Sequence, residues 1–203
     1  MSLHLIQYVP LALRTEKPLP TVAGRLSHAA LGLLTETGEI VTSVKRISIY
    51  SKPMDTPDDK GKTLRDHMAE EIGDAFWYVA IAADALTLDV QLLSYPRMVD
   101  NVIRPISDLS FELGGYVGRF AETVGFMTRG LDTTPMANER VILNNSLANI
   151  VCVLMQFCVS LEIDLGTVLD ENIAKLRERF PNAYSDEAAE ARADKGGLDA
   201  RNS

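Results

Sequence analysis

The chain has 203 residues, of which 46% are hydrophobic and 24% are charged, so it is long enough for one compact domain and too apolar for wholesale disorder. Twenty Lys and Arg stand against 28 Asp and Glu, which gives a formal net charge of -8. A chain this acidic lacks the electropositive surface that sequence-independent nucleic-acid binding needs. We therefore expect no nucleic-acid partner, and we expect any phosphate to be bound through a divalent cation and a few cationic side chains.

Targeting and redox signals point to the cytoplasm. No uninterrupted apolar run reaches the roughly 18 residues of a membrane helix, and the amino-terminal segment has neither a basic start nor a long apolar stretch. Cys152 and Cys158 lie in the apolar run 150–159, on different faces of a helix and with no other Cys or His nearby. We expect both thiols to be buried, reduced and inert. The expected location is cytoplasmic, without membrane contact.

Helical periodicity is nearly continuous from residue 21 onward and predicts an all-α protein. Thr21 can cap a first long helix, whose apolar positions recur every three or four residues as far as Val44. The segment 50–62 contains two prolines and a glycine and breaks the pattern. Thr63 and Asp66 form a capping-box pattern that opens a second amphipathic helix.

The second half continues the pattern. A third helix is expected over about 107–128, and a fourth ends near Ser160 after a turn in 130–135. Thr167 opens another capping-box pattern, which predicts a short amphipathic helix that stops at Pro181. The last twenty residues are rich in Ala, Asp, Glu and Arg, and their composition predicts a mobile tail.

The two halves are weakly similar to each other. A shift of 75 residues places 65–93 on 140–168, and a shift of 76 places Glu36 on Glu112. Two amphipathic helices often align this well by chance. The alignment alone leaves internal duplication undecided.

Two short carboxylate motifs are the strongest chemical signal. Glu36 and Glu39 lie three residues apart in the first helix, and Glu71 and Asp74 lie three apart in the second, so each pair shares a helical face. Both pairs have apolar neighbours, among which unpaired anions are costly to bury. If the helices pack antiparallel, the four carboxylates converge and need a cation, and all-oxygen ligation suits Mg²⁺ or Mn²⁺. Two separate solvent-facing charge clusters are the alternative.

Residues around these motifs carry weaker signals. Gly38 and Gly73 each precede the second carboxylate of a pair. A glycine inside a helix costs about 1 kcal/mol relative to alanine, so the matched placement predicts close backbone approach at both positions. His28 lies two turns before Glu36 and is interpreted as a packing residue or as a residue that supports the metal ligands from behind. Trp77 and Tyr78 are interpreted as core residues, with one of them lining a base pocket as the alternative.

At these motifs the chain resembles the MazG-like nucleoside triphosphate pyrophosphohydrolases. They belong to the all-α NTP pyrophosphatase superfamily, which includes the dimeric dUTPases. The carboxylate pairs with their flanking residues are fairly specific, and the carboxy-terminal Asn-x-x-Lys motif is moderately so. The resemblance covers about 22–93 and 163–194. The matching stretches are 31–39, 50–55, 70–78, 172–181 and 184–194.

The chain departs from the family pattern in one place. In simple family members the end of the second helix leads almost directly into the Asn-x-x-Lys motif, whereas here some seventy residues separate Asp89 from Asp164, where the junction recurs. This spacing favours duplication of the helical pair. The second pair keeps Glu112 but has Gly115, Ser146 and Asn149 at the positions of the other carboxylates, so we expect it to be catalytically dead.

The resemblance implies an all-α bundle of the MazG and dimeric-dUTPase type. We expect a single domain over 1–180 and a tail over 181–203. Within the domain we expect an active helical pair in 22–93, a degenerate pair in 105–165 and a motif helix in 166–180. The resemblance also implies a homodimer.

The activity that the resemblance implies is Mg²⁺-dependent hydrolysis of a ribo- or deoxyribonucleoside triphosphate to the monophosphate and pyrophosphate, in cleaning of the nucleotide pool. The four carboxylates would hold the metal, and Glu36 would be the general base. The residues that would bind phosphate are Lys45, Lys52, Asn172, Lys175 and Arg179, with a solvated surface charge as the alternative for each cation. A non-catalytic helical module that binds metal and nucleotide is the competing hypothesis. No motif reads the base or the sugar.

Overall fold

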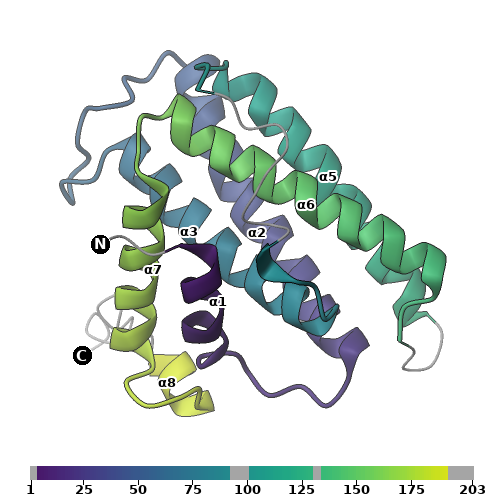
Figure 1. Ribbon diagram of the computed structural model, residues 1–203. Helices are drawn as coiled ribbons and strands as arrows, with labels where there is room; N and C mark the ends of the chain where they lie inside the picture. Colours follow the sequence, from purple (N-terminus) through teal and green to yellow (C-terminus); the bar gives the residue numbers. More distant parts are fainter. Residues whose placement is uncertain (1–3, 92–100, 130–133, 192–203) are drawn as a thin grey trace.

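The computed structural model describes residues 4–91, 101–129 and 134–191 (Figure 1). Within these ranges the regular elements are all helical, which confirms the predicted fold class. The helices are α1 (Leu5–Leu13), α2 (Val22–Ser48), α3 (Leu64–Ala85), α5 (Ile106–Thr128), α6 (Ala137–Ser160), α7 (Leu165–Arg179) and α8 (Asp186–Ala191).

Four long helices form the core of the molecule. α2 packs against α3 and α5, and α6 packs against α5 and α3, so the four close into a bundle. Figure 1 shows α5 and α6 side by side, with α1 and α7 together on the other side of the molecule. Both α1 and α7 pack against α3. Fully buried side chains of the bundle include Leu26, Leu33, Ile40, Met68, Ile72, Phe76, Leu109, Phe120 and Phe157. Burying each such side chain contributes about 1.5–3 kcal/mol relative to exposure.

The first two predicted helices begin where their caps indicate. The Thr21 hydroxyl accepts a hydrogen bond from the amide of Gly24 over 3.0 Å, and α2 starts at the next residue after Thr21. Thr63 and Asp66 form the reciprocal capping box of α3, with bonds of 2.8 and 3.0 Å. These side chains satisfy amide groups that have no partner inside the helix.

The start of α7 differs from the prediction. Its N-cap is Asp164, whose carboxylate accepts hydrogen bonds from the Thr167 amide over 2.8 Å and from the Thr167 hydroxyl over 3.0 Å. The expectation that Thr167 opens the helix was therefore wrong by one turn. Aspartate is at least as good a cap as threonine, and the earlier residue takes that role. The turn expected at 130–135 lies mostly outside the described residues.

Two helices were not predicted. α1 precedes the Thr21 cap, and Pro10 inside it obscures the helical pattern. α8 lies in the segment expected to be a mobile tail, and its Asp186 forms a 2.7 Å ion pair with Lys17, which lies between α1 and α2. Residues 186–191 are thus helical in a segment for which composition predicted no regular structure. Residues 192–203 lie outside the described residues.

The ends of α3 and α6 have the same local geometry. The residue after each final turn has a positive φ, 52° at Thr87 and 54° at Glu162, and these positions are 75 residues apart. In each case the next amide bonds back over one turn, Leu88 to the carbonyl of Ala83 and Ile163 to the carbonyl of Cys158. The alignment at a shift of 75 therefore matches two equivalent turns.

Reciprocal contacts join these two helix ends. The Arg65 guanidinium of α3 donates to the carbonyl of Leu161, and the Arg140 guanidinium of α6 donates to the carbonyl of Leu86. Residues 65 and 140, like 86 and 161, are 75 positions apart. Each helical pair thus supplies an arginine that satisfies a carbonyl at the end of the other pair.

The burial pattern of α2 matches that of α5 at an offset of 80 residues. The buried positions Ala29, Leu33, Thr37 and Ile40 correspond at this offset to the buried Leu109, Leu113, Val117 and Phe120. The sequence alignment used 76, which differs by four residues and therefore keeps the same helical face. At an offset of 80, Glu36 corresponds to Tyr116 rather than to Glu112. Glu112 instead forms an ion pair with Arg104.

α6 is the one helix among the described residues that is long and apolar enough to cross a membrane. Its most apolar window has a mean hydropathy of 1.6, and 56% of that window is buried inside the bundle. The core helix of a bundle has the same composition. Cys158 in this helix is buried, as predicted, whereas Cys152 is only half-buried, so the prediction of burial was wrong for Cys152. Burial raises the pKa of the Cys158 thiol to about 12, which disfavours the thiolate.

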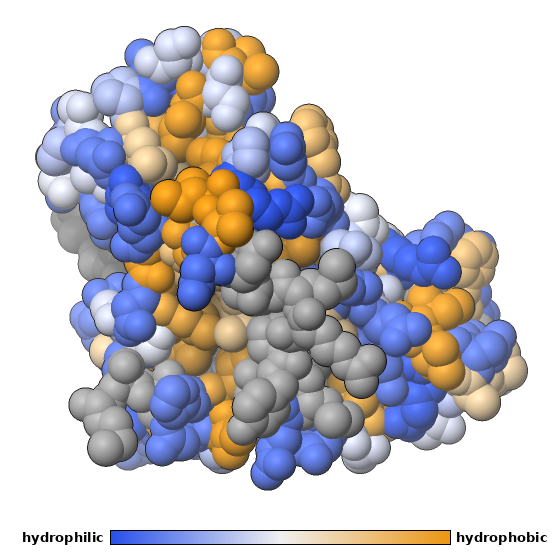
Figure 2. Space-filling model, turned by 45° about the horizontal axis from the view of Figure 1, so that its top comes forward, coloured by the Kyte–Doolittle hydropathy of each residue, from blue (hydrophilic) through white to orange (hydrophobic). Residues whose placement is uncertain are grey.

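Apolar side chains also reach the surface on α2 and α5. Leu31 is 66% exposed and Phe111 is 80% exposed. Figure 2 shows orange apolar patches separated by blue hydrophilic residues on the face that it presents. Scattered apolar exposure of this kind is ordinary for folded proteins.

Candidate metal centre

The packing of α2 against α3 brings three of the four expected metal ligands together. One carboxylate oxygen from each of Glu36, Glu71 and Asp74 lies within 4.8 Å of the others. Glu39 lines the same pocket but is not part of this close group. The spacing of Glu36 to Glu39 and of Glu71 to Asp74 puts each pair on the helix face that looks onto the neighbouring helix. An all-oxygen donor set of this kind fits Mg²⁺ or Mn²⁺.

The electrostatics of the group favour a bound cation. Burial raises the pKa of Glu71 to about 9, and a hydrogen bond with Glu36 and the charges of Glu39 and Asp74 act in the same direction. Burial likewise raises the pKa of Glu36, with the Asp74 charge adding to it. Both shifts favour a proton held between Glu36 and Glu71 over two ionised carboxylates. A divalent cation would displace that proton and neutralise the carboxylates.

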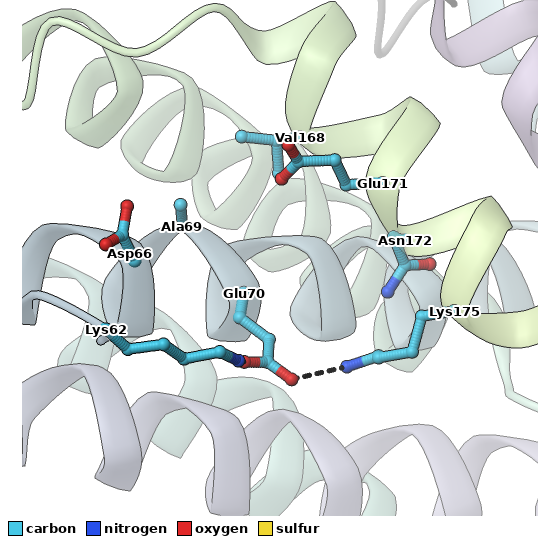
Figure 3. A pocket seen from close by; sticks show the side chains of 8 residues that line it. All are labelled: Lys62, Asp66, Ala69, Glu70, Val168, Glu171, Asn172 and Lys175. Carbon is cyan, nitrogen blue, oxygen red and sulfur yellow. Dashed lines mark hydrogen bonds and ion pairs between the residues drawn. The ribbon is translucent and has the colours of Figure 1, made fainter. Parts of the chain in front are cut away.

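α7 supplies the polar partners of Asp74. The Asn172 amide donates to Asp74 Oδ1 over 2.7 Å, and the Lys175 ammonium pairs with Asp74 Oδ2. Lys175 also lies 3.4 Å from Glu70 Oε1, and Figure 3 shows Asn172 and Lys175 reaching from α7 toward α3. Burial opposes the charge of Lys175, but the Asp74 carboxylate outweighs it and raises the lysine pKa. Both oxygens of Asp74 are thus oriented from α7.

Gly73 allows α7 to come this close. A Cβ at that position would lie 3.1 Å from the Asn172 Cβ and 3.4 Å from the Val168 carbonyl oxygen. The close backbone approach predicted at Gly73 is therefore confirmed. At Gly38 a Cβ would meet nothing within 4 Å, so the same prediction was wrong there. Gly38 faces away from the neighbouring helices.

The glycine of α2 that a close contact requires is Gly32, which the sequence analysis missed. A Cβ at Gly32 would lie 2.1 Å from two atoms of the Tyr78 ring. The ring therefore lies against the backbone of α2. Burial raises the pKa of Tyr78 to about 12, so the phenol is neutral at physiological pH. No carboxylate stands beside Gly32 in the sequence to single it out.

An aromatic wall closes one side of the pocket. The rings of His28, Trp77 and Tyr78 meet edge to face, with centroids 4.8 to 5.6 Å apart. The Trp77 indole donates to the Ala12 carbonyl over 3.1 Å and to the Thr15 hydroxyl over 3.0 Å, both near the end of α1. All three rings line the pocket. His28 packs against Trp77 and Tyr78, and both of those rings combine contacts inside the fold with a surface toward the pocket.

Two of the expected phosphate-binding residues border the pocket directly. Lys175 and Arg179 line it from α7, together with Lys17 from the α1–α2 connection. Lys45 and Lys52 do not: Lys45 is exposed near the end of α2, and Lys52 lines a separate surface pocket. Nine residues of helix place Lys45 about 13 Å along the axis from Glu36. Asn172 stands behind Asp74 and bonds to it, as described above.

The pocket has a volume of about 340 Å³, within the range of small-molecule sites. It combines a carboxylate group suited to a divalent cation, cationic side chains from α7 and an aromatic wall. Such a set can hold a polyanion neutralised by metal, with a planar ring system beside it. Comparisons with protein-family models, curated proteins and solved structures find no match to this chain.

Proposed function

We propose that this protein is a Mg²⁺-dependent pyrophosphohydrolase that converts a ribo- or deoxyribonucleoside triphosphate to the monophosphate and pyrophosphate. The observation that carries the proposal is the approach of Glu36, Glu71 and Asp74 to within 4.8 Å of one another in a pocket that cationic side chains also line. The resemblance of the same residues to the MazG-like motifs supports it. Three carboxylates this close repel one another, and a divalent cation between them would relieve that repulsion.

The side chains take separate roles in this proposal. The bound cation supplies charge neutralisation of the triphosphate and makes water a better nucleophile. Glu36, Glu71 and Asp74 hold the cation, with Glu39 at the edge of the group. The Thr35 hydroxyl, which donates to the Gly32 carbonyl over 2.8 Å, lies 3.1 Å from Glu36 Oε1. Glu36 then accepts the proton of the attacking water.

The residues of α7 and the aromatic wall would hold the rest of the substrate. Lys175 and Arg179 border the pocket on the side of α7, where they can pair with phosphate oxygens. Trp77 and Tyr78 offer apolar ring surface next to the carboxylates, which suits a nucleobase. Pyrophosphate leaves when water attacks the α-phosphorus, and the products are the monophosphate, pyrophosphate and a proton.

We also propose that the two helical pairs, α2 with α3 and α5 with α6, arose by internal duplication. The equivalent turns at Thr87 and Glu162 and the reciprocal caps from Arg65 and Arg140 support this. A chain built this way completes a four-helix bundle alone, as the resemblance to dimeric dUTPases implies. The first pair keeps the carboxylates and the second supplies packing.

The test is release of pyrophosphate by the purified protein with Mg²⁺ and each ribo- and deoxyribonucleoside triphosphate in turn. Pyrophosphate rather than orthophosphate should appear for at least one nucleotide, and EDTA should stop it. Nucleotide binding with metal but without pyrophosphate release would favour the non-catalytic binding module instead. An unfolding temperature that does not change when metal is added would favour a third hypothesis, a helical bundle with a purely structural role.

A further inference from the structure

A chain of two hydrogen bonds links the amino-terminal helix to the carboxylate group. The Tyr8 hydroxyl of α1 donates to Asn172 Oδ1 over 2.7 Å, and Asn172 Nδ2 donates to Asp74 Oδ1 over 2.7 Å. Tyr8 is fully buried and Asn172 is 4% exposed. Residues 8, 74 and 172 come from three different helices. The contact therefore joins α1, α7 and α3 at one point behind the pocket.

The direction of these bonds is fixed by the carboxylate. Asp74 can only accept, so Asn172 must turn its amide nitrogen toward it and its amide oxygen toward Tyr8. Water has little access to an oxygen this buried, and Tyr8 is the group that donates to it. Without the hydroxyl, the Asn172 oxygen would lack a donor, and rotation of the amide to find one would remove the donor from Asp74.

We propose that Tyr8 is a positioning residue for the metal centre: through Asn172 it holds the Asp74 carboxylate in the orientation in which it meets Glu36 and Glu71. The inference rests on the proposed metal site. Hydrogen-bonded partners behind metal ligands commonly set metal affinity in this way. Tyr8 does not line the pocket and touches no substrate in this arrangement.

A second contact of α1 agrees with this role. The carbonyl of Ala12 and the hydroxyl of Thr15 accept hydrogen bonds from the Trp77 indole, which forms part of the aromatic wall. The Thr15 hydroxyl itself donates to the Ala12 carbonyl over 2.8 Å. α1 thus fixes one carboxylate and one wall of the same pocket.

The experiment uses the full-length chain with Tyr8→Phe, which keeps the ring and removes only the hydroxyl. Binding of Mn²⁺ alone is measured from the decrease of the free-ion EPR signal, and unfolding in urea is followed without metal. We expect Mn²⁺ affinity to fall about tenfold, at the lower end of the effect of such partners. Thr123→Val is the matched control, because the Thr123 hydroxyl is also buried and donates within α5 to the Arg119 carbonyl. It should lower stability while leaving Mn²⁺ affinity unchanged.

A double-variant cycle identifies the route of the effect. If Tyr8 acts through Asn172, then Tyr8→Phe should change Mn²⁺ affinity little in an Asn172→Ala background. Additive losses, or unchanged Mn²⁺ affinity in a folded Tyr8→Phe protein, would overturn the inference. Wild-type protein that binds Mn²⁺ but releases no pyrophosphate would refute the proposed function and leave the role of Tyr8 standing. Wild-type protein that binds no Mn²⁺ would overturn both.

Discussion

Alanine substitutions at two glycines of α2 should have opposite effects on stability. Gly32 and Gly38 both lie inside the same helix, so replacing either by alanine gains about 1 kcal/mol of helix propensity. The new Cβ at Gly38 meets nothing within 4 Å, whereas the one at Gly32 would lie 2.1 Å from the Tyr78 ring. The comparison isolates the cost of that one contact, because the propensity gain is common to both variants.

The size of the cost follows from the packing of Tyr78. Carbon atoms in contact are separated by about 3.5–4.0 Å, so the ring must move by about 1.5 Å. It cannot move freely, because it meets His28 and Trp77 edge to face. Such overpacking typically costs about 1–3 kcal/mol. We expect Gly38→Ala to raise the free energy of unfolding by about 1 kcal/mol. The free energy of unfolding of Gly32→Ala should be about 1–3 kcal/mol lower than that of Gly38→Ala.

Urea unfolding of the metal-free protein measures this difference, and thermal unfolding should show a gap of about 2–4 °C for each kcal/mol. Because Tyr78 lines the pocket, Gly32→Ala should also weaken nucleotide binding, measured by calorimetry with Mg²⁺. Equal stabilisation by the two substitutions would refute the reasoning. It would mean that the ring does not lie against the backbone of α2.

Three further predictions concern the carboxylates. Glu71→Gln should abolish Mg²⁺-dependent pyrophosphate release while metal-free stability in urea holds or rises slightly, because the change removes one crowded acid without changing its shape. Glu112→Gln should leave the rate of pyrophosphate release unchanged, because Glu112 pairs with Arg104 away from the pocket; a loss comparable to that of Glu71→Gln would contradict the single site. Metal-free stability should fall as pH rises from about 4.5 toward 9, because the native protein binds more protons than the unfolded chain in that window, where Glu71 has its raised pKa. Calorimetry should then show a larger Mg²⁺-induced stabilisation at pH 8.5 than at pH 5.5, and the reverse order would contradict it.

The four long helices could be predicted because their signals are local. Each has an apolar stripe at helical spacing. Thr21 and Thr63 mark the starts of α2 and α3, and each cap bonds to an amide only three residues further on. α1 lacked such signals, since it is short and contains Pro10. α8 was obscured by a composition that is also typical of solvated tails. Their positions depend on packing with distant segments, which periodicity does not report.

The candidate site could likewise be predicted only in part. The carboxylate pairs lie on single helical faces, so spacing alone indicated that they could converge. Which cations lie near them depends on the axial rise of α2 and on the approach of α7 at Gly73, and spacing in the sequence did not show that Lys45 and Lys52 lie outside this pocket. Tyr8 could not be identified from the sequence, because its hydrogen-bond partner lies 164 positions away.

The bundle explains why its two halves can differ in charge while sharing a fold. At offsets of 80 residues for α5 and 75 for α6, the second pair has Tyr116, Arg119, Ser146 and Asn149, with no carboxylate among them. A surface with these side chains has no crowded anions and no need for a divalent cation, so it can pack and be solvated at no electrostatic cost. The first pair carries the opposite arrangement, in which burial and neighbouring carboxylates raise the pKa of both Glu36 and Glu71. Under the proposed function, a bound cation would therefore relieve repulsion in the first pair and would have no counterpart in the second.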